Sequence, residues 1–99
     1  MQTSFTKEEI SYIQVALKWS SSHENRYYPI DFNNDVKEHL LSSLVEKFSN
    51  YHIFTQFTKQ EFTFLALALH EQICILQEEN LGTEPLYSAF EKCSDCAEA

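Results

Sequence analysis

One histidine and three cysteines have the spacing of metal ligands on helices, which makes them the residues of this 99-residue chain best suited to chemistry. His70 and Cys74 are four residues apart, so a single helix would place both side chains on one face. Cys93 and Cys96 are three residues apart and would share a face of the next helix in the same way. If these helices form a hairpin about Gly82, the four side chains come level and could hold zinc as a Cys₃His site.

The cysteines also have simpler interpretations. Cys93 matches Phe48 in the internal repeat described below, which favours a buried core thiol. A redox pair of Cys93 and Cys96 is a weaker alternative, because the acidic residues beside them disfavour thiolates. An odd number of cysteines without a recognisable secretory signal predicts reduced thiols in the cytoplasm. We therefore expect no cofactor in the leading interpretation and zinc in the alternative one.

No other set of residues has the pattern of an active site. The sequence contains no glycine-rich phosphate loop, no dinucleotide fingerprint and no HExxH motif. Carboxylates that are adjacent in sequence, such as Glu8 and Glu9, point about 100° apart on a helix and cannot share a proton. The other histidines, His23, His39 and His52, have no partner at ligand spacing, so we expect them to be solvated. We predict that the protein is not an enzyme.

The net charge of −8 is concentrated in the second half of the chain. Residues 1–59 carry seven acids against six bases, a balance of −1, whereas residues 60–99 carry eight acids against Lys92 alone, a balance of −7. One arginine and few lysines argue against direct binding to nucleic acid. A basic protein surface, or the nucleic-acid-binding surface of another protein, would be attracted instead.

Three acids gather where a predicted helix ends, and they are candidates for contacting such a partner: Glu78, Glu79 and Glu84. Negative charge at the C-terminal end of a helix opposes the helix dipole. The alternative is that these acids only keep a small protein soluble.

The two halves of the chain resemble each other. Residues 5–13 match residues 57–65 at an offset of 52, and residues 41–47 match residues 86–92 at an offset of 45. Shared helix-start chemistry could explain part of the first match without common ancestry. We predict one domain, residues 1–99, that contains a hairpin repeat at about 5–50 and a second at about 57–96.

Each repeat begins with a helix-start signal. Thr6 and Glu9 have the spacing of a capping box, and Thr58 and Glu61 repeat it, in each case after a phenylalanine that can act as a hydrophobic staple. Asp35 and Glu38 form a plausible capping box for the second helix. Gly82 suits the end of the third helix, and Thr83 suits the N-cap of the fourth. The sequence therefore predicts an all-α fold, an antiparallel four-helix bundle of two αα-hairpins. Its expected helices span 7–20, from 34 or 35 to about 50, 59–80, and from the Thr83 cap to 93 or 96.

Aromatic residues make up 14% of the chain, more than four short helices readily cover. Several fall outside the helical stripes, including Tyr51 and Phe54, and others lie on the long connection 21–33. Aromatic and arginine side chains often carry binding energy, so we expect this connection to contact a partner or a second copy in a homodimer. The alternative is that it folds back over the open end of the bundle. The candidate contact residues are Trp19, Arg26, Tyr27, Tyr28 and Phe32.

These features predict a small acidic interaction or regulatory protein that acts by binding another protein. An adaptor, an inhibitor or an antitoxin-like protein would fit. The alternative is a zinc-binding or redox-responsive helical module that uses His70, Cys74, Cys93 and Cys96. No segment has the length and hydropathy of a membrane span, so we expect a cytoplasmic protein.

Overall fold

The computed structural model describes residues 4–23, 33–79 and 84–98. Within these ranges the chain is helical, with no strand, and the predicted all-α class is confirmed. The four helices are α1 (Lys7–Ser22), α2 (Asn34–Ser49), α3 (Lys59–Glu78) and α4 (Glu84–Glu98).

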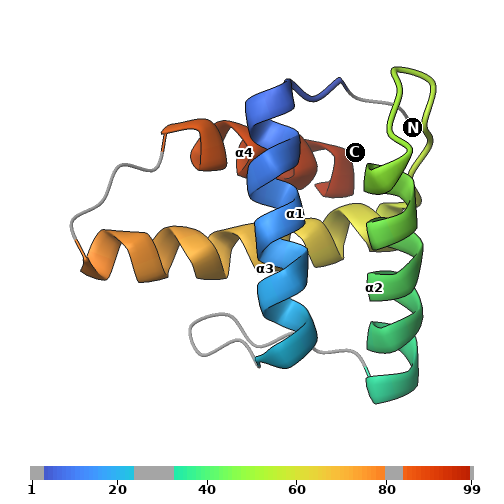
Figure 1. Ribbon diagram of the computed structural model, residues 1–99, viewed down its shortest axis with the longest axis horizontal. Helices are drawn as coiled ribbons and strands as arrows, with labels where there is room; N and C mark the ends of the chain where they lie inside the picture. Colours follow the sequence, from blue (N-terminus) through green and yellow to red (C-terminus); the bar gives the residue numbers. More distant parts are fainter. Residues whose placement is uncertain (1–3, 24–32, 80–83, 99) are drawn as a thin grey trace.

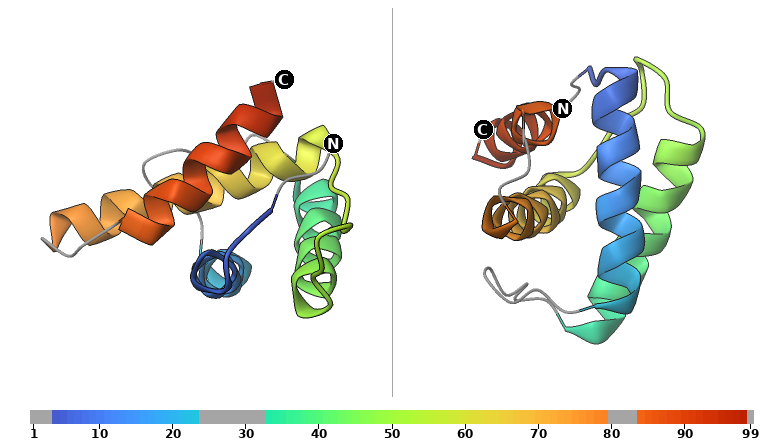
Figure 2. Two further views of the ribbon diagram at one scale, coloured as in Figure 1. Left: turned by 90° about the horizontal axis from the view of Figure 1, so that it is seen from above. Right: turned by 60° about the vertical axis from the view of Figure 1, so that its left-hand side comes forward.

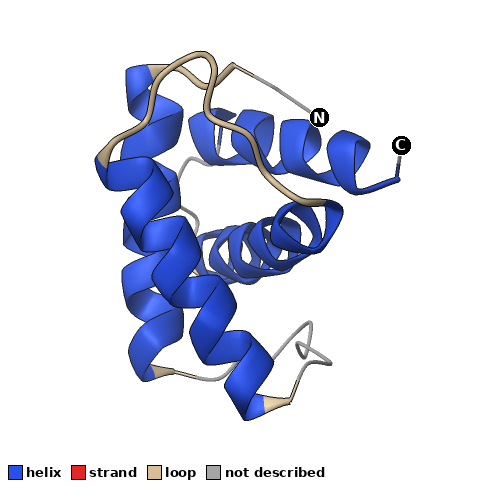
Figure 3. Ribbon diagram, turned by 90° about the vertical axis from the view of Figure 1, so that its right-hand side faces the viewer, coloured by secondary structure: helices blue, strands red, loops and turns tan. Residues whose placement is uncertain are grey.

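The helices form two pairs that lie across each other. In Figure 1, α1 and α2 run in opposite directions side by side, and α3 and α4 do the same. The α3–α4 pair crosses the α1–α2 pair, as the views in Figure 2 show from two further sides. α1 contacts all three other helices, and Figure 3 shows that helices and short loops make up the whole described chain. The molecule is a compact helical bundle in which the two pairs are not aligned along one axis.

Both predicted capping boxes are formed. The Thr6 hydroxyl accepts the backbone N–H of Glu9 at 3.1 Å, while the Glu9 carboxylate accepts the backbone N–H of Thr6 at 2.7 Å. At the start of α3 the Thr58 hydroxyl accepts the N–H of Glu61 at 3.0 Å, and the return bond to Thr58 N–H is 2.7 Å long. The two helices therefore begin with the same local structure, as the matching sequences predict.

The predicted start of α2 at Asn34 or Asp35 is confirmed, because the helix begins at Asn34, but the predicted cap was wrong. The N-cap is Asn33, whose side chain accepts the backbone N–H of Val36 at 2.9 Å, so Asp35 and Glu38 do not form the cap. Asparagine is among the best N-cap residues, and Asn33 directly precedes the first helical residue. The other ends also differ by small amounts: α1 extends to Ser22, α3 ends at Glu78, and α4 continues to Glu98. Gly82 and Thr83 lie outside the described residues.

The core contains an aromatic cluster where the starts of α1 and α3 meet the end of α2. The two staple residues, Phe5 and Phe57, lie 6.3 Å apart between ring centroids, and Phe48 packs on both. Phe57 precedes the α3 cap and also contacts Phe62 of that helix, with ring centroids 5.4 Å apart. The remaining buried apolar residues include Ile13, Leu17, Leu40, Leu44, Phe64, Leu65, Leu69, Ile73, Leu86 and Cys93.

No helix in the described part of the chain is long and apolar enough to cross a membrane.

Candidate functional site

Glu61, the last residue of the second capping box, is a buried carboxylate at the contact between α2 and α3. In addition to the Thr58 N–H, it accepts the Ser43 hydroxyl at 2.8 Å and the Lys47 ammonium at 2.7 Å. Its side chain is only 3% exposed, whereas that of Lys47 is 31% exposed. The Lys47 ammonium also lies 5.4 Å from the centre of the Phe57 ring. We call this set the α2–α3 cluster.

Glu9 is held in the same way at the contact between α1 and α4. Its carboxylate accepts the Ser88 hydroxyl at 2.7 Å and the Lys92 ammonium at 2.7 Å. The Lys92 ammonium donates a further hydrogen bond to the Ser4 carbonyl oxygen at 2.9 Å and lies 5.9 Å from the Phe5 ring. We call this set the α1–α4 cluster.

The two clusters join the halves of the chain crosswise. The glutamate of the first half is bound by serine and lysine of the second half, and the glutamate of the second half by those of the first. Each serine precedes its lysine by four residues, so both project from one face of a helix toward the same carboxylate. The matches at offsets 52 and 45 therefore correspond to equivalent contacts, and a buried charge is compensated at both sites.

The electrostatics of the clusters point to structure rather than to acid–base chemistry. Burial is the largest influence on each carboxyl and favours its neutral form. The hydrogen bonds from lysine, backbone and serine, together with the lysine charge, outweigh it, so the pKa values of Glu9 and Glu61 lie below their ordinary value. Both carboxylates are ionised at neutral pH, and their oxygens accept hydrogen bonds from lysine, serine and backbone groups. Neither has a proton to transfer.

The four predicted metal ligands are not gathered into one site. Among the described residues, no three histidine, cysteine, aspartate or glutamate side chains lie in an arrangement that could hold a metal ion. Cys93 is fully buried at the position equivalent to Phe48, and burial raises the pKa of its thiol, which keeps it protonated. His70 packs against the Phe90 ring at 4.7 Å, and burial lowers its pKa, which favours the neutral imidazole. Cys74 and Cys96 are partly exposed thiols.

The predicted partner-binding residues differ in their exposure, and some lie outside the described part of the chain. Trp19 is partly exposed and stacks on His23 with ring centroids 4.6 Å apart. Glu78, Glu79 and Glu84 are exposed, as a partner contact requires. Arg26, Tyr27, Tyr28 and Phe32 lie outside the described residues.

Two of the eight acids of residues 60–99 are buried, so they do not contribute to the exposed acidic surface. Glu71 contributes to the negative charge of residues 60–99, but it is completely buried, and Glu61 is only 2% exposed. The acids of the second half that remain exposed are Glu78, Glu79, Glu84, Glu91, Asp95 and Glu98.

The outward face of α4 carries a row of acids that we call the acidic stripe: Glu84, Glu91, Asp95 and Glu98. Their spacings of seven, four and three residues keep them on one side of the helix. Tyr87 lies beside them and is 45% exposed. The only basic residue of α4 is Lys92, which pairs with Glu9, so no positive charge from this helix balances the stripe.

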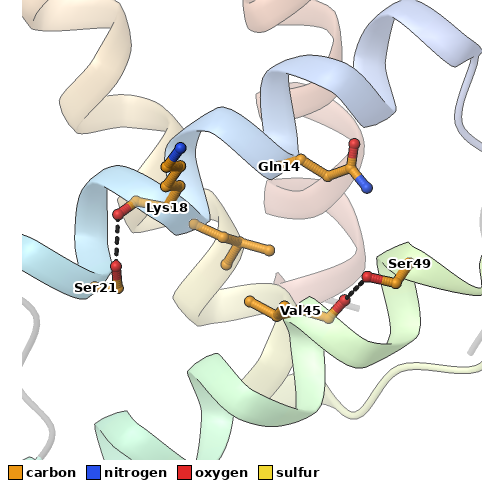
Figure 4. A pocket seen from close by; sticks show the side chains of 6 residues that line it. Gln14, Lys18, Ser21, Val45 and Ser49 are labelled. Carbon is orange, nitrogen blue, oxygen red and sulfur yellow. Dashed lines mark hydrogen bonds between the residues drawn. The ribbon is translucent and has the colours of Figure 1, made fainter.

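A groove of about 370 Å³ lies between α1 and α2, and Figure 4 shows it from close by. Leu17 and Val45 supply its apolar surface. The Ser21 and Ser49 hydroxyls on its walls donate to the backbone carbonyls of Lys18 and Val45, so their protons are already used within the helices. The groove suits an apolar side chain better than a charged substrate, and all its lining residues belong to the first half.

A tight turn at residues 52–55, which the sequence did not predict, presents two large apolar side chains to solvent. The Thr55 N–H donates to the His52 carbonyl at 3.0 Å, the His52 N–H to the Thr55 hydroxyl at 3.0 Å, and the Phe54 N–H to His52 Nδ1 at 3.1 Å. Ile53 is 63% and Phe54 69% exposed. A histidine three residues before a threonine, with no glycine or proline between them, is a weak turn signal.

The crosswise clusters were also missed, although the sequence held a usable signal. Ser43 and Lys47 repeat as Ser88 and Lys92 with the same spacing, and each pair is matched by a buried box glutamate. The hydrogen-bonding partners of these pairs could not be read from either half alone.

Comparison of the chain with protein-family models, with curated proteins and with solved structures finds no match in any of the three.

Proposed function

We propose that this chain is a small acidic regulatory protein that acts by binding another protein, with the acidic stripe of α4 as the contact surface. The partner would present lysine or arginine side chains, as a basic protein surface or a nucleic-acid-binding surface does. An adaptor, an inhibitor or an antitoxin-like protein works in this way, by occupying a surface of its partner.

The one-sided charge of α4 carries this proposal. Four of the six exposed side chains of this helix are acidic, and its single lysine is committed to Glu9. A surface selected only for solubility tends to intersperse charges of both signs. Tyr87 adds an exposed aromatic side chain beside the stripe, and tyrosine is enriched among residues that anchor interfaces.

Charge reversal on two helices tests the proposal. The variant Glu91→Lys/Asp95→Lys reverses the middle of the stripe, while Glu8→Lys/Glu38→Lys changes the net charge equally at exposed positions of α1 and α2. Each tagged protein is used to capture partners from an extract of its native host at low and physiological salt, with the captured proteins identified by mass spectrometry.

We expect the wild type and the α1/α2 variant to capture the same basic protein, and the stripe variant to lose at least about tenfold of it. Capture should also weaken as salt rises, because exposed charges more than about 8 Å apart are screened at physiological ionic strength. Equal capture by all three proteins would reduce the stripe to a solubility device.

A further inference from the structure

The contacts between the halves are reciprocal, so they do not require both halves to come from one chain. Glu61 needs a serine and a lysine four residues apart on a facing α2, and Glu9 needs the same from a facing α4. A second copy of the chain supplies both facing helices with the same groups. Two copies that exchange their α3–α4 pairs would therefore keep every crosswise bond of the two clusters.

The segment that connects the halves is built so that it can open. In the described part of the chain, the hydrogen bonds of residues 52–56 stay within the turn and tie it to neither helix pair. The chain is anchored on both sides of the turn, by half-buried Tyr51 and by buried Phe57 in the aromatic cluster. Straightening the turn costs three local hydrogen bonds, which water can replace, and leaves both anchors in place.

The exposed side chains of the turn argue for a second copy as the occupant of this surface. Ile53 and Phe54 are the two most exposed large apolar residues in the described part of the chain. In the closed monomer they contact solvent, whereas in an exchanged dimer two straightened connections run side by side and can cover these residues. The apolar area removed from water then favours the dimer.

We propose that the chain forms a homodimer by exchanging α3–α4 between two copies, with residues 52–56 as the hinge. Lys47 and Ser43 of each copy then bind Glu61 of the other, and Ile53 and Phe54 of the two hinges pack together. Exchange of identical elements is a low-cost route to a dimer because the interface already exists in the monomer. The dimer also presents two acidic stripes, although the proposal does not depend on the function of the stripe.

The first test measures the dimer of the full chain directly. The protein is refolded from urea at millimolar concentration and separated by size-exclusion chromatography with light scattering. We expect a dimer that persists for hours after dilution, because dissociation requires the two halves to separate. The variant Ile53→Ser/Phe54→Ser should weaken this dimer at least about tenfold. The control Tyr12→Ser/Val15→Ser, which removes two other exposed apolar side chains, should leave it unchanged. No dimer, or equal weakening by both variants, would overturn the proposal.

The second test distinguishes exchange from a surface contact. Lys47→Met leaves Glu61 without its cation, and Glu61→Gln leaves Lys47 without its anion, so each variant has a mismatched α2–α3 cluster. Exchange between one copy of each variant creates one wild-type cluster and one uncharged cluster. The two variants, one isotope-labelled, are unfolded together, refolded and weighed by native mass spectrometry. With the two variants in equal amounts, random pairing gives mixed and like dimers in a ratio of 1:1, and we expect this ratio to rise to about 10:1. A statistical mixture, or no dimer even when the chains are refolded together, would contradict exchange.

Discussion

The α2–α3 cluster and the α1–α4 cluster use the same four kinds of group at nearly the same distances. In each, a box threonine, a serine and a lysine surround one buried glutamate, and the lysine–carboxylate distance is 2.7 Å in both. One difference between their surroundings is that Lys92 also donates to the Ser4 carbonyl. The outer surfaces of the halves differ far more: the charge balance is −1 over residues 1–59 and −7 over residues 60–99.

This contrast separates the contacts that stabilise the fold, which the two halves share, from the surface charges, in which the halves differ. The repeated residues include the two buried glutamates and the serines and lysines that bind them across the halves. The acidic stripe has no counterpart on α2, whose charge includes Lys37 and Lys47 as well as acids. Recognition of a partner is therefore expected to depend on the residues in which the halves differ.

The largest effect should come from the equivalent core positions Phe48 and Cys93. Both are buried, but the side chains differ greatly in size. Phe48→Ala should lower the free energy of unfolding by about 3–5 kcal/mol, because it removes the central ring of the aromatic cluster and leaves a cavity. Cys93→Ala removes a single sulfur atom and should cost about 1 kcal/mol. Urea unfolding followed by circular dichroism measures both. If the two variants lowered the free energy of unfolding equally, the size of the buried side chain would not decide the cost, and the prediction would be wrong.

Removing either cluster lysine should produce the next largest effect. Lys47→Met and Lys92→Met each leave a buried carboxylate without its cation, at a cost of about 3 kcal/mol. The two costs should agree within about 0.5 kcal/mol, because the extra bond from Lys92 is to an exposed carbonyl that water can satisfy. Chemical denaturation at pH 7 gives both values. A small cost at one site alone would break the equivalence of the clusters.

Acid should destabilise the protein through both clusters. The pKa values of Glu9 and Glu61 are lowered on folding, so their contribution is fully present above the ordinary value of 4.5 and is lost as pH falls through the lowered values. Urea midpoints measured at pH 7, 5, 4 and 3 should fall mainly below the ordinary value. The double variant Glu9→Gln/Glu61→Gln should have a flatter profile in that range. An identical profile would exclude these carboxylates as the cause.

Loss of one helix cap should have the smallest effect. Thr6→Ala and Thr58→Ala each remove the hydroxyl that accepts a backbone N–H, and each should cost about 1 kcal/mol. Conservative Thr→Ser replacements at the same positions should cost less than half as much. Thermal melts monitored at 222 nm compare the four variants. If Thr6→Ala and Thr58→Ala lost clearly different amounts of stability, one capping box would contribute less than its geometry implies.

Local chemistry made the helices and both capping boxes predictable. The patterns that mark a helix start act within four residues, so Thr6 with Glu9 and Thr58 with Glu61 could be recognised in the sequence. The match of Cys93 with Phe48 also predicted its burial correctly.

Apart from the local choice of Asn33 as the α2 cap and the turn at residues 52–55, the features that were missed are contacts between distant segments. Glu71 was counted with the acids that attract a partner, because a carboxylate on a helix is usually exposed and its burial depends on what packs over it. The crosswise pairing was missed for the same reason: the spacing of Ser43 and Lys47 fixes a helix face but not which helix it meets. The alternative zinc interpretation assumed that residues level in a hairpin face one another, and the structure places Cys93 in the core.

The central claim is that the glutamate of each half is bound by the lysine of the other half, and double-mutant cycles measure this most directly. Cycles with Glu→Gln and Lys→Met in urea unfolding would compare the crosswise pairs Glu9–Lys92 and Glu61–Lys47 with the same-half pair Glu9–Lys47. We predict a coupling of about 1.5–3 kcal/mol for both crosswise pairs and additivity within about 0.5 kcal/mol for the same-half pair. Coupling between Glu9 and Lys47, with additive crosswise pairs, would contradict the account.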